Sequence, residues 1–306
     1  MRPEPRRGLR LFMLVWLLAS TAVLAAAPRL ELPPLLEPAS SERHPGKIIW
    51  VELATSDLES ARRFYGGLLG WTFRDVRGAR LPFSIALLNG EPVAGLVQPR
   101  SPRNGQRQPN WLPFIATSDV RALKQQAVAH GARVLSAPRS YPNRGEQAVF
   151  ADPQGAVFGV LQSTSGDPPD ELSDPGEWIW STLLTRDPGK DSAFYQTLFG
   201  YEVQDLPGED STAHLLLSSE GYARASVNEL PPEIPKQYPY WLCFVRVLSA
   251  KTAVDKAKTL GASVLVEPHE DRHGGLVAVI ADPQGAPIGL LEWVESAAAS
   301  PDGGAQ

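Results

Sequence analysis

The chain repeats itself once, and a single constant offset relates the two copies. The offset that takes Asp57 to Asp187, here called the repeat offset, also relates Phe64-Tyr65 to Phe194-Tyr195, Trp111 to Trp241, and the segment Asp152–Ala156 to Asp282–Ala286. A period this long indicates two duplicated domains, because the repeating units of solenoid proteins span about 20 to 50 residues. The 306 residues then divide into two domains of ordinary size.

The composition is that of a soluble globular protein, with 43% hydrophobic and 21% charged residues. We therefore expect the chain to bury two ordinary cores. The first 27 residues carry +3, since four arginines outweigh Glu4, which leaves −8 on the rest of a chain with net charge −5. An acidic body without a basic stripe argues against nucleic acid as a partner and favours a small molecule.

Residues 1–27 have the layout of an export signal. Four arginines precede an apolar run over residues 11–27, which ends in small residues. Cleavage after Ala25 would release the protein into the periplasm of the cell envelope or into the medium. Because the run lies at the short limit for spanning a bilayer, an uncleaved membrane tether through residues 11–27 is the alternative. A misassigned start codon is a third explanation.

The remaining boundaries follow from the repeat and from proline content. Residues 28–46 hold five prolines and predict a stiff, largely extended spacer. The two domains are expected at 47–163 and 176–294, joined by a linker at 164–175. Residues 295–306 are expected to form a flexible tail.

Each domain contains a finer repeat. The segment Ala54–Asp57 recurs within the first domain as Ala116–Asp119, and each copy precedes apolar residues at helical spacing. The aspartate is placed to cap the first helical turn, and Gly70 suits a left-handed helix stop. Strand-like segments follow each predicted helix. The chain therefore contains four modules of the type strand, helix, strands.

These residues resemble the vicinal oxygen chelate superfamily, which includes glyoxalase I, bleomycin-resistance proteins and extradiol dioxygenases. The resemblance rests on Asp57-Leu58-Glu59 leading into Phe64-Tyr65 and Leu69-Gly70-Trp71, and on the closing turn Asp152-Pro153-Gln154-Gly155. It implies an α+β fold in which each of the two tandem domains is a pair of βαβββ modules. The paired modules would form a half-open barrel around a ligand cavity.

The family resemblance also implies where a metal would bind. Metal-using members carry a His seven residues before the capping Asp and a Glu four residues after the glycine of the closing turn. These positions hold Trp50 and Gly159 in the first domain, and Trp180 and Gly289 in the second. None of these side chains ligates a divalent metal. We therefore predict no metal and no other cofactor.

One sequence pattern runs against this prediction. His269–His273 matches HExxH, the zinc-protease motif, which requires a helix to bring both histidines to one face. Pro268 before it and Gly274-Gly275 after it instead indicate a loop between strands.

The candidate ligand-binding residues are Trp50, Glu52, Trp180 and Thr182. Alternate residues of a strand share a face, so Glu52 lies on the face of Trp50 and Thr182 on that of Trp180. Two tryptophans in place of metal ligands predict a dry aromatic wall for a planar or apolar ligand. Alternatively, both simply fill space. Glu52 is also a weak catalytic candidate, because a carboxyl beside an apolar wall has a raised pKa and can act as a general base.

Three functions are compatible with these features. The first is an exported protein that binds a small aromatic or amphipathic molecule without a metal. The second is a glyoxalase- or lyase-type enzyme, whose turnover would depend on Glu52 or on an added metal. The third is a non-catalytic interaction scaffold. The sequence leaves the identity of the ligand open.

Overall fold

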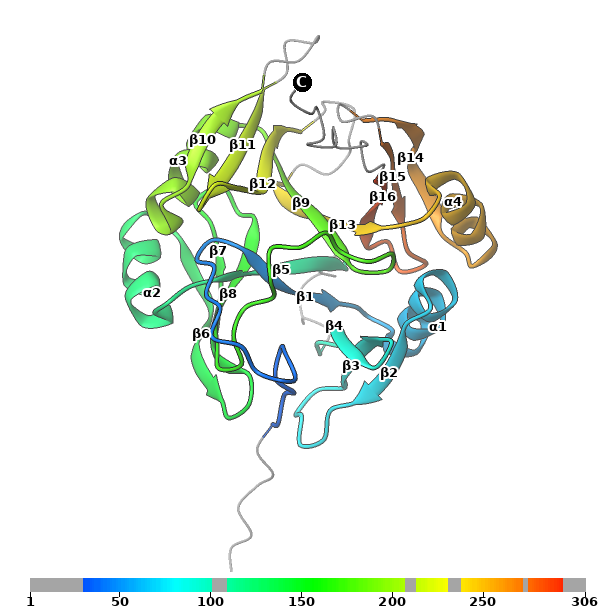
Figure 1. Ribbon diagram of the computed structural model, residues 1–306, viewed down its shortest axis with the longest axis horizontal. Coiled ribbons are helices and arrows are strands. Elements are labelled where there is room, and N and C mark those ends of the chain that lie inside the picture. The colour runs from blue at the N-terminus through cyan, green and yellow to red at the C-terminus, as the bar shows by residue number, and fades with distance from the viewer. Residues whose placement is uncertain (1–29, 101–108, 207–212, 231–237, 272–274, 294–306) are drawn as a thin grey trace, which may run out of the picture.

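The computed structural model describes residues 30–293 except 101–108, 207–212, 231–237 and 272–274 (Figure 1). The predicted leader over residues 1–27 and the predicted tail over 295–306 therefore lie outside the described residues. None of the helices in the described part of the chain is long and apolar enough to cross a membrane.

The first domain contains two βαβββ modules in succession. The first module consists of β1 (Ile48–Ala54), α1 (Leu58–Leu69), β2 (Thr72–Asp75), β3 (Phe83–Leu88) and β4 (Glu91–Val97). The second consists of β5 (Asn110–Ala116), α2 (Val120–Ala129), β6 (Arg133–Tyr141), β7 (Gly145–Ala151) and β8 (Val157–Ser163).

The second domain repeats this order. Its first module consists of β9 (Trp178–Thr185), α3 (Pro188–Phe199), β10 (Glu202–Asp205), β11 (His214–Ser219) and β12 (Tyr222–Glu229). Its second consists of β13 (Tyr240–Arg246), α4 (Ala250–Thr259), β14 (Ser263–Glu270), β15 (Leu276–Ala281) and β16 (Pro287–Glu292). His269 and Glu270 end strand β14, so the described part of the HExxH pattern is extended and not helical.

Each domain forms one eight-stranded sheet. The strand order is β2-β3-β4-β1-β5-β8-β7-β6 in the first domain, and the second domain has the equivalent order β10-β11-β12-β9-β13-β16-β15-β14. The two modules of a domain join where their first strands pair antiparallel, β1 with β5 and β9 with β13. The predicted α+β fold of tandem paired modules is thus confirmed.

Helix ends follow the local chemistry read from the sequence. The side chains of Asp57, Asp119 and Asp187 accept hydrogen bonds from backbone N–H groups in the first turns of α1, α2 and α3. Gly70 and Gly200 end α1 and α3 with φ of 76° and 70°, a conformation that costs other residues steric strain.

The two large hydrophobic cores are each shared between the domains. One core joins β1 and α1 of the first domain to β13, α4, β15 and β16 of the second. The other joins β5, α2, β7 and β8 to β9, α3, β11 and β12. The two expected cores are thus present, and both domains contribute to each of them. The sheets lie back to back, with α1 beside α4 and α2 beside α3 (Figure 1).

Residues that recur in both copies link the domains through this shared interior. Trp111 Nε1 donates to Tyr65 Oη at 3.0 Å, and Tyr65 Oη donates to Asp282 Oδ2 of the other domain at 3.0 Å. The reciprocal chain runs from Trp241 Nε1 to Tyr195 Oη at 3.1 Å and on to Asp152 Oδ2 at 3.1 Å. The repeated Trp, Tyr and Asp are thus a reciprocal interdomain contact.

The back-to-back packing leaves the opposite, concave face of each sheet directed away from the other domain. Residues 30–46, here called the strap, cover the first concave face at Leu35, which is 6% exposed, and Leu32 is also buried, at 3%. Leu35 packs with Trp50, Phe114 and other residues of that face. The predicted spacer over residues 28–46 forms no helix or strand in its described part, residues 30–46, but it is not a free linker there, because Leu32 and Leu35 are buried.

Candidate functional site

The two positions that would hold a metal in this fold lie in one row across the concave face of the first domain. Trp50 on β1 pairs with Phe114 on β5, and Phe114 pairs with Gly159 on β8. A Cβ atom added at Gly159 would overlap Cδ1 of Phe114. The Phe114 ring therefore occupies the space that a longer side chain at position 159 would need.

The second domain repeats this row. Trp180 pairs with Phe244, Phe244 pairs with Gly289, and a Cβ atom at Gly289 would overlap Cδ1 of Phe244. Phe114 and Phe244 are themselves related by the repeat offset, a correspondence that the sequence reasoning did not use. Because neither row offers an oxygen or nitrogen ligand at these positions, the residues present do not fit a metal there.

The first concave face carries charge at its centre. Trp50 Nε1 donates to Glu52 Oε1 at 3.1 Å, so the indole donor is used within the protein. The Arg144 guanidinium lies over the face of this tryptophan ring, with Cζ 4.0 Å from the ring centroid. Burial raises the pKa of Glu52, while the Trp50 hydrogen bond and the charge of Arg144 act in the opposite direction.

Arg144 is held by the turn that precedes β7. Its backbone N–H donates to Tyr141 O, and its carbonyl accepts from Thr164 N. Gly145 has a φ of 116°, and a Cβ atom there would overlap Gln162 O, so only glycine fits. Burial lowers the pKa of Arg144 to about 10, which leaves the guanidinium protonated at neutral pH.

The concave face of the second domain is more open and more apolar. Trp180 is partly exposed there, and its Nε1 donates to Ser226 Oγ at 3.2 Å. Thr182 Oγ1 lies 2.9 Å from the same Ser226 Oγ. Trp180 packs against a buried apolar cluster of Leu242, Phe244 and Leu291. The other residues packed against this cluster are Ile179, Leu184, Tyr240, Val277 and Val279.

The four predicted site residues therefore lie on the two concave faces as two separate pairs. Glu52 contacts Trp50, and Thr182 and Trp180 share the hydroxyl of Ser226. Their roles in ligand binding stay predictions. In the first domain Arg144 adds a second charge beside Trp50, next to the Glu52 carboxyl that the prediction already placed there. The sequence analysis did not identify Arg144 as a site residue. The one feature of the sequence that sets Arg144 apart is that the corresponding residue of the second domain is Gly274, so the charge is not repeated.

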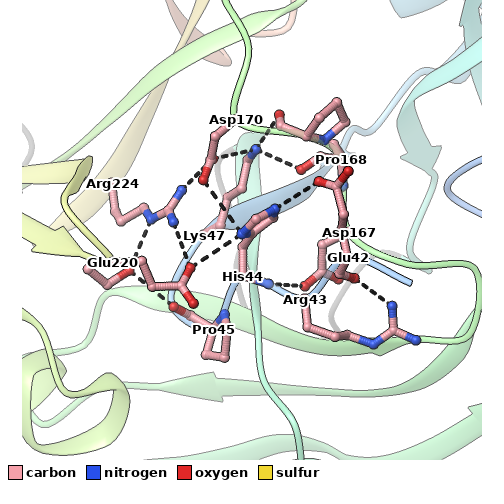
Figure 2. A network of polar contacts seen from close by, with 12 residues as sticks. Glu42, Arg43, His44, Pro45, Lys47, Asp167, Pro168, Asp170, Glu220 and Arg224 are labelled. Atoms are coloured by element: carbon pink, nitrogen blue, oxygen red, sulfur yellow. Dashed lines mark hydrogen bonds and ion pairs between the residues drawn. The ribbon is translucent and has the colours of Figure 1, made fainter. Parts of the chain in front are cut away.

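A second polar cluster, here called the clasp, joins the strap to the interdomain linker and to the β11–β12 hairpin (Figure 2). Asp170 Oδ1 accepts from Lys47 Nζ at 2.8 Å and from Arg224 Nη1 at 2.5 Å. Arg224 Nη2 lies 3.0 Å from Glu220 Oε2, and His44 N donates to Asp167 Oδ2 at 2.7 Å. Three segments far apart in the sequence are thus tied at one point.

The clasp contains one group with metal-ligand geometry. Single ligand atoms of His44, Asp170 and Glu220 lie within 4.8 Å of one another. However, Lys47 and Arg224 already neutralise these carboxylates, so a divalent cation would meet two fixed positive charges. The cluster fits an ion-pair network better than a metal site.

Comparison with known proteins identifies both halves of the chain. Residues 47–160 match the Glyoxalase/Bleomycin resistance protein/Dioxygenase superfamily, and residues 180–291 match a Glyoxalase-like domain. The chain is 30% identical over 260 residues to "Putative glyoxylase CFP32" of Mycobacterium bovis, covering 83% of this chain and 98% of that protein. It is also 30% identical over 274 residues to "Anthracycline biosynthesis protein DauV" of Streptomyces sp. strain C5, covering 85% and 98%.

Solved structures share the fold at lower identity. The Mn(II)-bound glyoxalase from Novosphingobium aromaticivorans aligns with a TM-score of 0.57 and 16% identity, covering 82% of this chain and 83% of that one. At this identity the likeness concerns the fold alone.

Proposed function

Because this chain belongs to the Glyoxalase/Bleomycin resistance protein/Dioxygenase superfamily as a tandem two-domain member, we propose that it binds a small planar aromatic or amphipathic molecule without a metal. The concave face of the second domain is the proposed receptor, with Trp180 as its stacking surface. The single observation that carries this proposal is a partly exposed Trp180 that packs against a cluster of apolar side chains.

Two further observations support the proposal. Phe244 fills the space beside Gly289, which favours contact with an apolar molecule over coordination of an ion. Two relatives are named for anthracycline biosynthesis, and anthracyclines are planar polycyclic aromatic molecules. Thr182 and Ser226 would supply the few polar atoms that orient a ligand on this apolar face.

The test is calorimetric titration of the protein with 1,4-dihydroxyanthraquinone, a neutral planar probe. We expect saturable binding that EDTA does not change. Trp180→Ala should weaken the affinity about tenfold or more, because it removes both the buried ring area and the stacking geometry. The matched control is Tyr222→Ala, which removes an aromatic ring that is 52% exposed and lies outside the concave cluster.

Two results would contradict the proposal. One is unchanged affinity in Trp180→Ala, provided that its circular dichroism and melting temperature match those of the wild type. The other is binding that appears only with stoichiometric divalent metal.

A glyoxalase- or lyase-type enzyme is the second candidate. Glu52 favours it, because burial raises the pKa of this carboxyl toward the range of a general base. Turnover of a small substrate that disappears in Glu52→Gln would favour the enzyme over the binding protein.

We also infer export to the periplasm or the extracellular space, from the arginine-rich start and the apolar run over residues 11–27. The mass of the protein purified from its own host would test this inference. A loss that corresponds to cleavage after Ala25 is expected, whereas an intact mass in the membrane fraction would indicate the tether.

A further inference from the structure

We propose that the concave face of the first domain is a binding site for a small carboxylate, which the Arg144 guanidinium holds, and that the strap opens to admit it. This site is separate from the proposed receptor of the second domain, and neither proposal depends on the other.

The first argument is the state of Arg144. The residue is 1% exposed, and among the described residues none of its three guanidinium nitrogens has a hydrogen-bond partner. Buried polar groups are normally satisfied, and a buried cation without hydrogen bonds is costly. A buried guanidinium without hydrogen-bond partners in the protein indicates that a bound ligand supplies the acceptors.

The second argument concerns which ligand fits. Guanidinium presents a planar fork of N–H donors that matches the two oxygens of a carboxylate. Glu52 does not serve as that partner, because its hydrogen bond comes from Trp50 and the guanidinium nitrogens bond to nothing in the described part of the chain. The Arg144 guanidinium thus lies near the Glu52 carboxylate, but its N–H groups are still available to hydrogen-bond a ligand.

The third argument is the polarity of the surrounding face. Asn110 pairs with Ala54, and Gln147 pairs with Leu161, which places both on the concave side of the sheet. Asn110 Oδ1 and Gln147 Oε1 are buried and lack hydrogen-bond donors among the described residues. These oxygens would accept from a hydroxyl or N–H group elsewhere on the same ligand.

The fourth argument is the way the strap covers the face. Leu35 belongs to the same buried cluster as Trp50, Phe114 and Ile85, where the apolar part of a ligand would lie. Its backbone N–H donates to Ser165 Oγ at 2.9 Å, and Leu36 N donates to the same oxygen at 3.1 Å. At Leu35 and Leu36 the cover is therefore held by two backbone hydrogen bonds to one serine hydroxyl and by the burial of Leu35. Displacing Leu35 would expose an apolar surface beside Arg144.

The experiment compares 1-naphthoate with 1-naphthamide, its uncharged counterpart, by calorimetric titration of the full chain. We expect naphthoate to bind at least tenfold more tightly than naphthamide. Arg144→Gln should lower naphthoate affinity at least tenfold, because it removes a charged hydrogen-bond donor. Arg63→Gln is the matched control, since Arg63 is exposed on α1 and its loss should leave the affinity unchanged.

Two more variants test the geometry. Leu35→Ala weakens the closed strap and should raise naphthoate affinity several-fold, because more of the protein is then in the open state. Glu52→Gln keeps an acceptor for Trp50 and removes a negative charge, so it should also tighten binding. If Arg144→Gln does not fold, Arg144→Lys keeps the charge but loses the fork, and it should still weaken binding.

The proposal is overturned if naphthoate fails to bind the Leu35→Ala variant, if naphthamide binds equally well, or if a folded Arg144 variant binds like the wild type. The anthraquinone titration of the second domain serves as an internal reference. It should be the same in the Arg144 and Leu35 variants, so failure of one proposal is distinguishable from failure of the other.

Discussion

Asp191 shows how one side chain can break the symmetry of the repeat. It lies in the first turn of α3, is 1% exposed, and has Ala61 as its counterpart in the first domain. Burial raises its pKa to about 7, and the nearby charges of Asp152 and Asp187 act in the same direction. The second domain therefore contains a carboxyl group that titrates near neutral pH.

This shift predicts a pH dependence of stability. The pKa of Asp191 is about 7 in the folded chain against 3.8 for an ordinary aspartate, so the folded state binds this proton more tightly. The free energy of unfolding should fall as pH rises from about 4 to about 7. Asp191→Asn should flatten this fall and raise stability above pH 7, as measured by urea unfolding between pH 4.5 and 8.

The control for this prediction is Asp255→Asn, because Asp255 has a side chain that is 80% exposed on α4. That variant should keep the wild-type slope. A wild-type slope in Asp191→Asn would show that Asp191 is ionised in the folded protein across this pH range.

Among the secondary-structure elements, α1 and α3 are held to the opposite domain by their tyrosines. Tyr65 is 0% exposed and both accepts from Trp111 and donates to Asp282. The hydroxyl thus satisfies a buried donor and a buried acceptor that lie on different domains. The same holds for Tyr195, Trp241 and Asp152.

Tyr65→Phe should lower the free energy of unfolding by about 1–3 kcal/mol, because it leaves the Trp111 N–H and an Asp282 oxygen without partners. Urea unfolding measures this loss. Tyr238→Phe removes the same hydroxyl from a residue that is 76% exposed and should change stability by less than about 0.5 kcal/mol. Equal effects of the two substitutions would show that the interdomain hydrogen bond makes no net contribution to the free energy of unfolding.

Across the molecule as a whole, the clasp ties the strap to both domains. Burial acts to raise the pKa of Asp170, but hydrogen bonds and charges from Arg224 and Lys47 outweigh it and lower the pKa. Lys47 also donates to the carbonyls of Pro168 and Pro169 at 2.8 and 2.6 Å. The position of the strap thus depends on charges in the linker and in the second domain.

Lys47→Met should loosen the strap while the fold persists, because Asp170 keeps Arg224 as a partner. Hydrogen exchange should quicken at the amides of Leu35, Leu36 and Ser40, whose protection comes from Ser165. Lys251→Met, which removes an exposed lysine of α4, is the control and should leave these rates unchanged. Unchanged rates in Lys47→Met would mean that Leu35 burial alone holds the strap.

The modules, their tandem arrangement and the family could all be predicted from the sequence alone. Helix capping by Asp57 or Asp187 involves residues three positions apart, and strand alternation involves residues two positions apart, so both are encoded locally. The repeat offset then showed that the unit occurs twice. The family resemblance placed Trp50 and Trp180 on the inward face of each sheet, and both lie on the concave faces in the structure.

The partner of each buried face, in contrast, became known only from the folded chain. Hydrophobic spacing shows that a face is buried, but it carries no information about what covers that face, so the cores shared between domains were not predictable. Leu35 meets Ser165 across 130 residues and Tyr65 meets Asp282 across 217. The burial of the strap and the position of Arg144 over Trp50 arise in the same way, from contacts that form only when distant segments fold together.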